Sequence, residues 1–414
     1  MRVSQVESFL LSCPLPQPEV LAYYGGERTI LKRDAMLIRI KTDNGLTGWA
    51  PGQASEKAHR MIQEQIAPFL TGHALADPDA LRIKFFSAVP DPEARKVYCA
   101  VEVALYDLVG QHQGTPISEL LGGRVRDRIL LYGSGGMYMP PEDYAAEAAA
   151  VQSLGFSAYK MRPGLGPEED LRTVKLMREA TGAAFDLMVD AHTWWRMGDR
   201  SYGPEISARM AADLGEFDIT WLEEPLPPDD HEAYAKLKAS ASVPIASGEH
   251  EPSDDGFLDL IAQECVDYVQ TDLVCQGGYA TGKKVLAEVQ AQDLKFAFHS
   301  WGTDLEVLAA AHLGICWPET VVEWLEYPLY RREGVPVMYP FSLANEILAE
   351  PLPIENGELI VPRASGLGIK INEKVLEKYP WIPGPWSRFK LISPPGEWVV
   401  TSDHSIQWAG PQHQ

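Results

Sequence analysis

Three acidic residues close successive β-rich runs in the middle of the chain. Asp190, Glu223 and Glu249 each end such a run, and a helical stretch follows each. Neighbouring strands lie about 4.8 Å apart, so three carboxylates at one height can converge on a single ion. Without a cation they would repel one another, and an all-oxygen set with no thiolate favours Mg²⁺ over Zn²⁺. The alternative is three unrelated rim acids, each paired with a neighbouring cation.

The next two strand ends supply a candidate general base. Asp272 closes one run and His299 closes the next, so the two side chains can pair across neighbouring strands. An Asp–His pair orients the imidazole and raises its basicity, as proton abstraction requires. A buried core histidine held by hydrogen bonds is the structural alternative, and we favour the base because a carboxylate cluster lies opposite.

Parity along the strands indicates further inward-facing groups, because residues two apart on a strand point the same way. Lys160 and Arg162 share such a face on one strand, and His192 shares one with Asp190. The sequence therefore places two cationic groups and an imidazole on the inner face, near the carboxylate of Asp190.

Four more residues are candidate substrate contacts. Glu326 lies on the last β-rich run, and His250 directly follows Glu249. Tyr24 belongs to the aromatic-polar segment 23–28, which we expect to be a flexible loop, and Trp194 follows the run that ends near Asp190. For each of the four, packing, ion pairing or plain solvation is the structural alternative.

The elements that must position these groups repeat along the chain. Eight β-rich runs alternate with helical stretches, and the polar strand ends from Lys160 to Glu326 are spaced 23 to 33 residues apart. This rhythm predicts an α/β fold of the (β/α)₈ TIM-barrel type over residues 126–350. A doubly wound open sheet would call for a Gly-rich phosphate turn, which is missing. Residues 1–125 predict a separate α+β capping domain with a tight Asn44-Gly45 hairpin, and residues 351–414 a segment that returns to it.

Composition restricts the partners of such a protein. Lys and Arg total 36 and Asp and Glu total 58, which gives a net charge of −22 over 414 residues. So acidic a surface repels nucleic acid and anionic membranes, yet it can contain a locally cationic pocket for a small anion. The five cysteines are widely spaced and no apolar run is long enough to span a membrane, so we expect a soluble cytoplasmic protein that acts on a small molecule.

These residues together resemble the enolase superfamily, and within it the mandelate racemase and muconate lactonizing enzyme group. Two further stretches are similar to that group. Residues 104–108 through 120–123 resemble its segment between cap and barrel. Residues 356–359 and 366–369 resemble its closing segment, with Ser365 where a proline is usual.

The resemblance implies Mg²⁺-assisted removal of the proton α to a carboxylate, in a symmetric homo-oligomer. The implied roles are metal ligation by Asp190, Glu223 and Glu249, a His299–Asp272 base, a Lys160–Arg162 pair in place of two lysines, and a last-strand acid at Glu326. Arginine does not deprotonate usefully in proteins, so a single base favours β-elimination over racemisation.

We therefore expect an acid-sugar dehydratase that converts an aldonate or aldarate to a 2-keto-3-deoxy acid. In such an enzyme Lys160 and Arg162 would hold the substrate carboxylate or hydroxyls. His192 would be a candidate proton donor to the leaving hydroxyl, or a residue that only orients the site. The alternatives are a racemase or epimerase that uses Lys160 as a second base, and a catalytically silent metal-binding protein.

Overall fold

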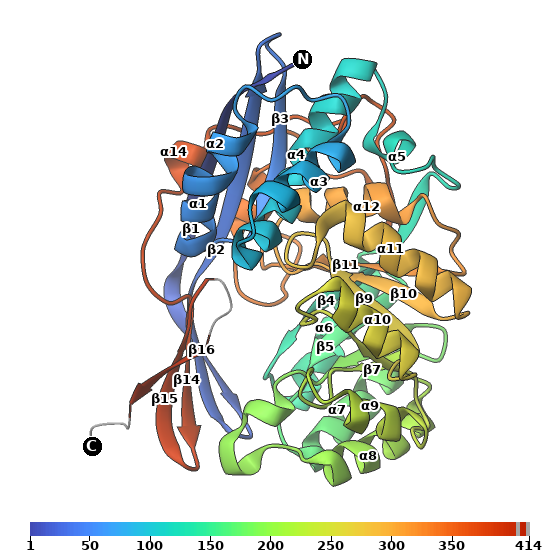
Figure 1. Cartoon of the computed structure of the whole chain (residues 1–414). Coiled ribbons are helices and arrows are strands. Elements are labelled where there is room, and N and C mark those ends of the chain that lie inside the picture. Colours follow the sequence, from blue (N-terminus) through green and yellow to red (C-terminus); the bar gives the residue numbers. More distant parts are fainter. Residues whose placement is uncertain (403–405, 411–414) are drawn as a thin grey trace.

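The catalytic core predicted for the middle of the chain is a closed barrel of eight parallel strands (Figure 1). The computed structural model describes residues 1–402 and 406–410. Pairing runs in sequence order from β4 to β11, and the parallel pairing of β11 with β4 closes the ring. The strands are β4 (Arg128–Met137), β5 (Ala158–Arg162), β6 (Asp186–Asp190), β7 (Trp221–Glu223), β8 (Ile245–Ser247), β9 (Tyr268–Asp272), β10 (Lys295–His299) and β11 (Val322–Pro328). The predicted (β/α)₈ barrel is confirmed.

Helices between the strands cover the outside of the barrel (Figure 1). They are α6 (Pro141–Ser153), α7 (Pro167–Thr181), α8 (Pro204–Asp213), α9 (His231–Lys238), α10 (Asp254–Ala262), α11 (Gly278–Ala291) and α12 (Asp304–Gly314). Helix α7 shows how the sequence sets the limits of these helices. Pro167 opens it with three acids in the first turn, and Gly182, with a φ of 79°, ends it. Among the described residues, no helix is both long enough and apolar enough to cross a bilayer.

The inside of the barrel carries one apolar layer to which every strand contributes a side chain. Its members are Tyr132, Ala158, Met188, Trp221, Ala246, Tyr268, Ala297 and Trp324. Lys160, Asp190 and Glu223 each follow a member of this layer by two positions, and so do His299 and Glu326. Strand alternation therefore turns these ionisable groups inward, directly above the apolar layer at the carboxyl end of the barrel.

A separate N-terminal domain combines three antiparallel strands with a helical layer. The strands are β1 (Val3–Tyr23), β2 (Gly26–Thr42) and β3 (Thr47–Gly52), and the helices are α1 (Glu56–Met61), α2 (Ala67–Leu70), α3 (Pro78–Ala88) and α4 (Pro92–Gln113), with a π-helical turn at Ile62–Ile66. The hairpin predicted at Asn44-Gly45 joins β2 to β3. Segment 23–28 is not the flexible loop that we expected. Tyr23 ends β1 and pairs with Gly26 of β2, and β14 pairs with Gly26–Arg28, so only Tyr24 and Gly25 form the turn.

The C-terminal segment contributes to both halves of the molecule. Strands β12 (Ile354–Glu355) and β13 (Glu358–Ile360) form a hairpin that adds to barrel strand β4. Strands β14 (Ser387–Ile392), β15 (Pro395–Val400) and β16 (Ile406–Gly410) extend the N-terminal sheet through pairing of β14 with β2. Short helices α5 (Ile117–Leu120), α13 (Ser342–Glu346) and α14 (Val375–Lys378) lie in the connections. The first and last strands of the chain thus lie in one sheet beside the barrel (Figure 1).

Asp107 on α4 joins the two stretches that suggested the family in the sequence. One carboxylate oxygen accepts the backbone N–H of Trp49 in β3 at 3.0 Å, and the other accepts that of Leu367 at 2.9 Å. The preceding Gly366 has a φ of 68°, and a Cβ there would lie 2.1 Å from the Asp107 carboxylate. The closing segment can approach helix α4 this closely only because that position is glycine.

Candidate active site

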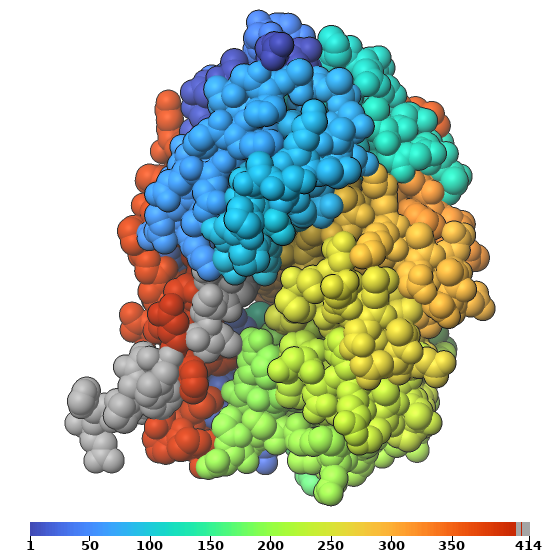
Figure 2. Space-filling model, viewed as in Figure 1, coloured from blue at the N-terminus to red at the C-terminus, as the bar shows by residue number. Residues whose placement is uncertain are grey.

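A cavity of about 310 Å³ opens at the carboxyl end of the barrel strands, and both domains line it. From the barrel it is lined by six of the predicted site residues, Arg162, His192, Glu249, His250, Asp272 and His299. From the other side it is lined by Arg28 and Arg33 of β2 and by Trp386 and Phe389 of the C-terminal segment. In Figure 2 the N-terminal part of the chain, in blue, lies directly against the yellow and orange part of the barrel.

His299 and Asp272 form the pair that the sequence predicts. They are register partners on β10 and β9, and Nδ1 of His299 lies 3.0 Å from Oδ2 of Asp272. The other carboxylate oxygen of Asp272 accepts the backbone N–H groups of Val274 and Cys275 at 2.9 and 3.0 Å. The turn after β9 therefore fixes the carboxylate, the carboxylate fixes the imidazole, and Nε2 is directed toward the centre of the site.

The surroundings of His299 favour its charged form. Nε2 lies 3.0 Å from Glu249 and 3.8 Å from Glu326. Burial alone would lower the pKa of His299, but the charges of Glu249 and Glu326 and the hydrogen bond to Asp272 raise it well above the ordinary value. These carboxylates would therefore stabilise the imidazolium that forms once Nε2 has taken up a proton.

Lys160 and Arg162 lie on the inner face of β5, as predicted, but in different surroundings. The Lys160 ammonium is fully buried and lies 2.6 Å from Glu223, 3.2 Å from Glu326 and 3.6 Å from Asp190. Arg162 lies 2.8 Å from Asp190 through Nε, and its guanidinium stacks 3.6 Å above the ring of Trp301. Arg162 reaches the cavity, whereas three carboxylates surround Lys160.

The predicted metal ligands are brought to the same end of the barrel, but they do not share one set of partners. Asp190 and Glu223 are register partners on β6 and β7, and both contact Lys160. The second oxygen of Glu223 accepts the indole N–H of Trp221 at 2.8 Å. Glu249 instead faces His299 and His250.

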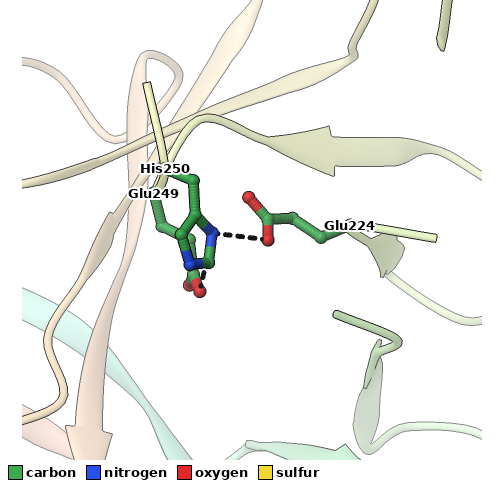
Figure 3. Close-up of side chains that lie close together, drawn as sticks. All are labelled: Glu224, Glu249 and His250. Atoms are coloured by element: carbon green, nitrogen blue, oxygen red, sulfur yellow. Dashed lines mark hydrogen bonds and ion pairs between the residues drawn. The ribbon is translucent and has the colours of Figure 1, made fainter. Parts of the chain in front are cut away.

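A second group of possible ligands forms around Glu249 (Figure 3). Among the described residues, ligand atoms of Glu224, Glu249 and His250 all lie within 4.8 Å of one another. Nδ1 of His250 is 2.7 Å from Glu224 and 3.5 Å from Glu249. Burial would lower the pKa of His250, but Glu224 outweighs it and raises the pKa to about 9. His250 is therefore part of the site and is held by a carboxylate.

Glu224 is a site residue that the sequence reasoning missed. Strict alternation along the strand would turn it to the outer face, opposite to Glu223. Strand β7 ends at Glu223, however, and Glu224 has a φ of 43°, a left-handed conformation that costs a non-glycine residue about 1–3 kcal/mol. This turn ends the alternation and brings both carboxylates to the site. The consecutive pair of acids was the only signal in the sequence.

The residues present fit a hard divalent cation. Asp190, Glu223, Glu224, Glu249, Asp272 and Glu326 are all buried within this end of the barrel. The permanent cations that are ion-paired with them there are Lys160 and Arg162. Oε1 of Glu224 is buried without a hydrogen-bond donor. So many carboxylates around so few cations fit an ion such as Mg²⁺, which prefers oxygen ligands.

His192 and Glu326 also lie where the sequence predicts. Nδ1 of His192 is 2.9 Å from the Asp190 carboxylate, and the ring borders the cavity. Burial lowers the pKa of His192 in spite of that carboxylate. Glu326 is fully buried, contacts Lys160, and accepts the backbone N–H of Ser300 at 3.1 Å. Glu326 therefore acts on the site through its neighbours.

Of the four predicted substrate contacts only His250 lines the cavity, and Trp194 and Tyr24, like the buried Glu326, do not. Trp194 is fully buried and packs 4.7 Å from the ring of Tyr202. Tyr24, at the tip of the β1–β2 hairpin, lies 6.1 Å from the same ring and under the guanidinium of Arg200. Both aromatic side chains join the hairpin tip to the loop after β6. They support the cavity wall rather than face the substrate.

Three arginines line the cavity in addition to the residues predicted for the site, two from the cap and one from the barrel. Arg28 and Arg33 on β2 are 5% and 4% exposed, and Arg196 follows β6; all three line the cavity. Arg28 falls in the segment that we took for a loop, and nothing in the alternation of β2 marks Arg33. Strand β2 pairs with β14, and residues of both strands line the cavity.

The fold and the site define a member of the enolase superfamily. Residues 143–375, more than half of the chain, match the family described as Enolase C-terminal domain-like. Residues 14–122 match the Mandelate racemase / muconate lactonizing enzyme, N-terminal domain. The chain belongs to the mandelate racemase and muconate lactonizing enzyme group of that superfamily.

Relatives in this family act on sugar acids or their derivatives, according to their names. The chain is 29% identical to the D-galactarolactone cycloisomerase of Agrobacterium fabrum, over 92% of this chain and 99% of the relative. It is 28% identical to the L-rhamnonate dehydratase of Saccharopolyspora erythraea, over 84% and 85%. Among solved structures, the 3,6-anhydro-D-galactonate cycloisomerase of Zobellia galactanivorans has a TM-score of 0.78 at 28% identity, over 92% and 99%.

Proposed function

We propose that this protein is a Mg²⁺-dependent acid-sugar dehydratase, a lyase that eliminates water from an aldonate or aldarate. The observation that carries the proposal is the His299–Asp272 pair, whose free nitrogen points toward a cluster of carboxylates suited to a cation. A base and a cation site facing each other across one cavity suit the removal of a weakly acidic proton next to a carboxylate. The relatives named as dehydratases support the reaction class.

Each group then has a task in the elimination. Bound Mg²⁺ would stabilise the negative charge that develops on the substrate carboxylate. His299 takes the proton from C2, with Asp272 orienting the ring. The C3–O bond breaks with its electrons, and the leaving hydroxyl takes up a proton and departs as water. His192, which borders the cavity, is the candidate donor of that proton, and Arg162 holds the substrate by charge and hydrogen bonds. The enol product rearranges to the 2-keto-3-deoxy acid.

The surroundings of Lys160 weigh against a racemase or epimerase. A second base must reach the opposite face of the substrate and must lose its proton. The ammonium of Lys160 is fully buried and ion-paired with three carboxylates, and the group that reaches the cavity from this strand is Arg162. A closely related reaction is ring opening, in which the oxygen lost from C3 belongs to a ring of the substrate. Relatives named as cycloisomerases make this reaction the second candidate.

Proton NMR in D₂O tests the proposal. The purified protein with Mg²⁺ is incubated with a panel of aldonates and aldarates. We expect a 2-keto-3-deoxy product that carries deuterium at C3, and we expect His299→Asn to abolish its formation. Deuterium at C2 without dehydration would support the epimerase. A folded protein that exchanges no substrate proton would support the catalytically silent scaffold.

A further inference from the structure

Two arginines in the cavity have no carboxylate partner. Arg28 is 5% exposed, and its contacts are uncharged groups: Ser387 Oγ at 3.4 Å, Met137 Sδ at 3.6 Å and the hydroxyl of Tyr138. Arg196 stacks 3.9 Å over the ring of Trp195, and its Nε is buried without an acceptor. Among the described residues, no carboxylate lies within 4.0 Å of either guanidinium.

A buried cation without a counter-ion is costly, and proteins normally pair it. Here the rings of Trp386 and Phe389 each lie 4.7 Å from the Arg28 guanidinium and replace part of its hydration. Burial lowers the pKa of both arginines. For Arg196 the charges of Glu224 and Glu249 offset part of this effect, and the charge of Arg28 adds to it. The two like charges therefore lie near each other in the cavity lining, and within the described chain neither is ion-paired with a carboxylate.

Arg33 adds a third guanidinium to this cavity lining. It donates to the hydroxyl of Tyr339 at 3.2 Å and to the carbonyl of Trp301 at 2.5 Å, both uncharged acceptors. Asp34, the next residue, is ion-paired with Lys32 at 3.0 Å. Arg28, Arg33 and Arg196, which we call the basic wall, are thus gathered at one cavity in a protein whose net charge is −22.

The cavity therefore holds two groups of charges. One is His299 with the acidic cluster, which suit a cation and the reacting carboxylate. Arg28 and Arg33 line the cavity from the cap, and Arg196, in the loop after β6, is near enough to both groups that the charges of Glu224, Glu249 and Arg28 all act on it. A guanidinium presents a fixed fork of donors that matches a carboxylate in two parallel hydrogen bonds. A sugar acid that ends in a neutral hydroxymethyl group would leave both guanidinium groups unpaired.

We propose that the substrate carries a second anionic group at the end away from the reacting carbon, held by Arg28 and Arg196. The substrate class is then the aldarates, sugar acids with a carboxylate at each end, rather than the aldonates. This inference rests on the proposed dehydratase function and narrows its substrate. A terminal phosphate offers the same charge, and it is distinguished below by its own measurement.

Binding and turnover of matched sugar acids test this inference. Galactarate, galactonate and 6-phosphogluconate are titrated by calorimetry, with Mg²⁺, into His299→Asn, which retains the cavity but lacks the base. We expect galactarate to bind at least about 100-fold more tightly than galactonate, since leaving a buried charge unpaired is expensive. Tighter binding of 6-phosphogluconate than of galactarate would assign the terminal anion as phosphate. Equal binding of galactarate and galactonate would overturn the inference, whether or not the wild type dehydrates either acid.

Variants at the basic wall separate specificity from folding. Arg28→Met keeps an unbranched stem between the two aromatic rings, and Arg196→Met changes a more exposed position. Each is expected to raise KM for the dianionic acid at least about 10-fold and to leave KM for the monoanionic acid nearly unchanged. Arg172→Met, at an exposed helical arginine, is the matched control and should change neither. An equal loss with both acids would assign these arginines a purely structural role and would contradict the proposal.

Discussion

His299 and Asp272 are partners in the register of two neighbouring parallel strands, and their side chains meet at 3.0 Å. The contact arises from the position of each residue at the end of its strand. Two backbone N–H groups after β9 hold the far oxygen of Asp272, so the carboxylate cannot turn away from the imidazole. The pair is therefore part of the barrel framework and does not depend on a mobile loop.

Loss of the base should slow proton abstraction strongly without unfolding the protein. We expect His299→Asn to lower the rate by roughly 10²–10⁴, the range that general base catalysis supplies. Asp272→Asn should lower it by roughly 10², because the ring loses its orienting partner. Solvent deuterium exchange into the substrate measures both rates. Asp229→Asn, at an exposed position, serves as the control, and full activity in Asp272→Asn would contradict the assigned role.

Mg²⁺ binding should require Glu249 and Glu223 and should depend much less on Glu224. We expect Mg²⁺ to raise the Tm of protein treated with EDTA, since the ion binds only the folded carboxylate cluster. Glu249→Gln and Glu223→Gln should weaken Mg²⁺ binding at least roughly 100-fold, whereas Glu224→Gln should weaken it much less. Titration calorimetry measures the affinities. If Glu224→Gln weakened Mg²⁺ binding more than Glu223→Gln did, the ion would instead be assigned to the group of Glu224, Glu249 and His250.

Asp107 should matter for stability because it joins the cap to the closing segment. Asp107→Asn retains the shape but replaces one acceptor with a donor, which faces a backbone N–H. We expect the free energy of unfolding to fall by about 1–3 kcal/mol in urea denaturation. Asp229→Asn should leave it unchanged. Unaltered stability of Asp107→Asn would show that Trp49 and Leu367 find other acceptors.

Asp170 should make stability depend on pH. It is buried and accepts the N–H groups of Gly164 and Leu165 and the hydroxyl of Tyr202. Burial raises its pKa from 3.8 to about 6 in spite of these bonds. The folded protein thus holds this proton more tightly than the unfolded chain, so the contribution to stability is present at low pH and is lost as pH rises from about 4 to about 6.

The comparison that isolates this effect is Asp170→Asn, which cannot titrate. Over that pH window the wild type should lose up to about 3 kcal/mol relative to the variant. Urea unfolding of both proteins at several pH values measures the difference. A constant difference across the window would mean that Asp170 stays ionised in the folded protein.

The barrel and most of its inward-facing polar residues follow from the sequence for a physical reason. Strand alternation and the spacing of strand ends are local patterns, and they place Lys160, Asp190, Glu223 and His299 correctly on strands. Glu224 could not be predicted as a site residue, because its own left-handed conformation ends the alternation of the strand. Arg28 lies on a strand rather than in the expected loop, because this part of β2 pairs with β14, more than 350 residues later. Local patterns carry no information about such a pairing.

The pairing of β2 with β14 also has a consequence for how the protein comes to be made. The barrel strands are synthesised between the two partners, so most of the chain has left the ribosome before Arg28 gains the neighbours Trp386 and Phe389. A nascent chain with a finished barrel already contains the acidic cluster, but its Arg28 still lacks the two aromatic rings that pack against the guanidinium. The ability to select a substrate therefore arises last, when the final strands close the sheet.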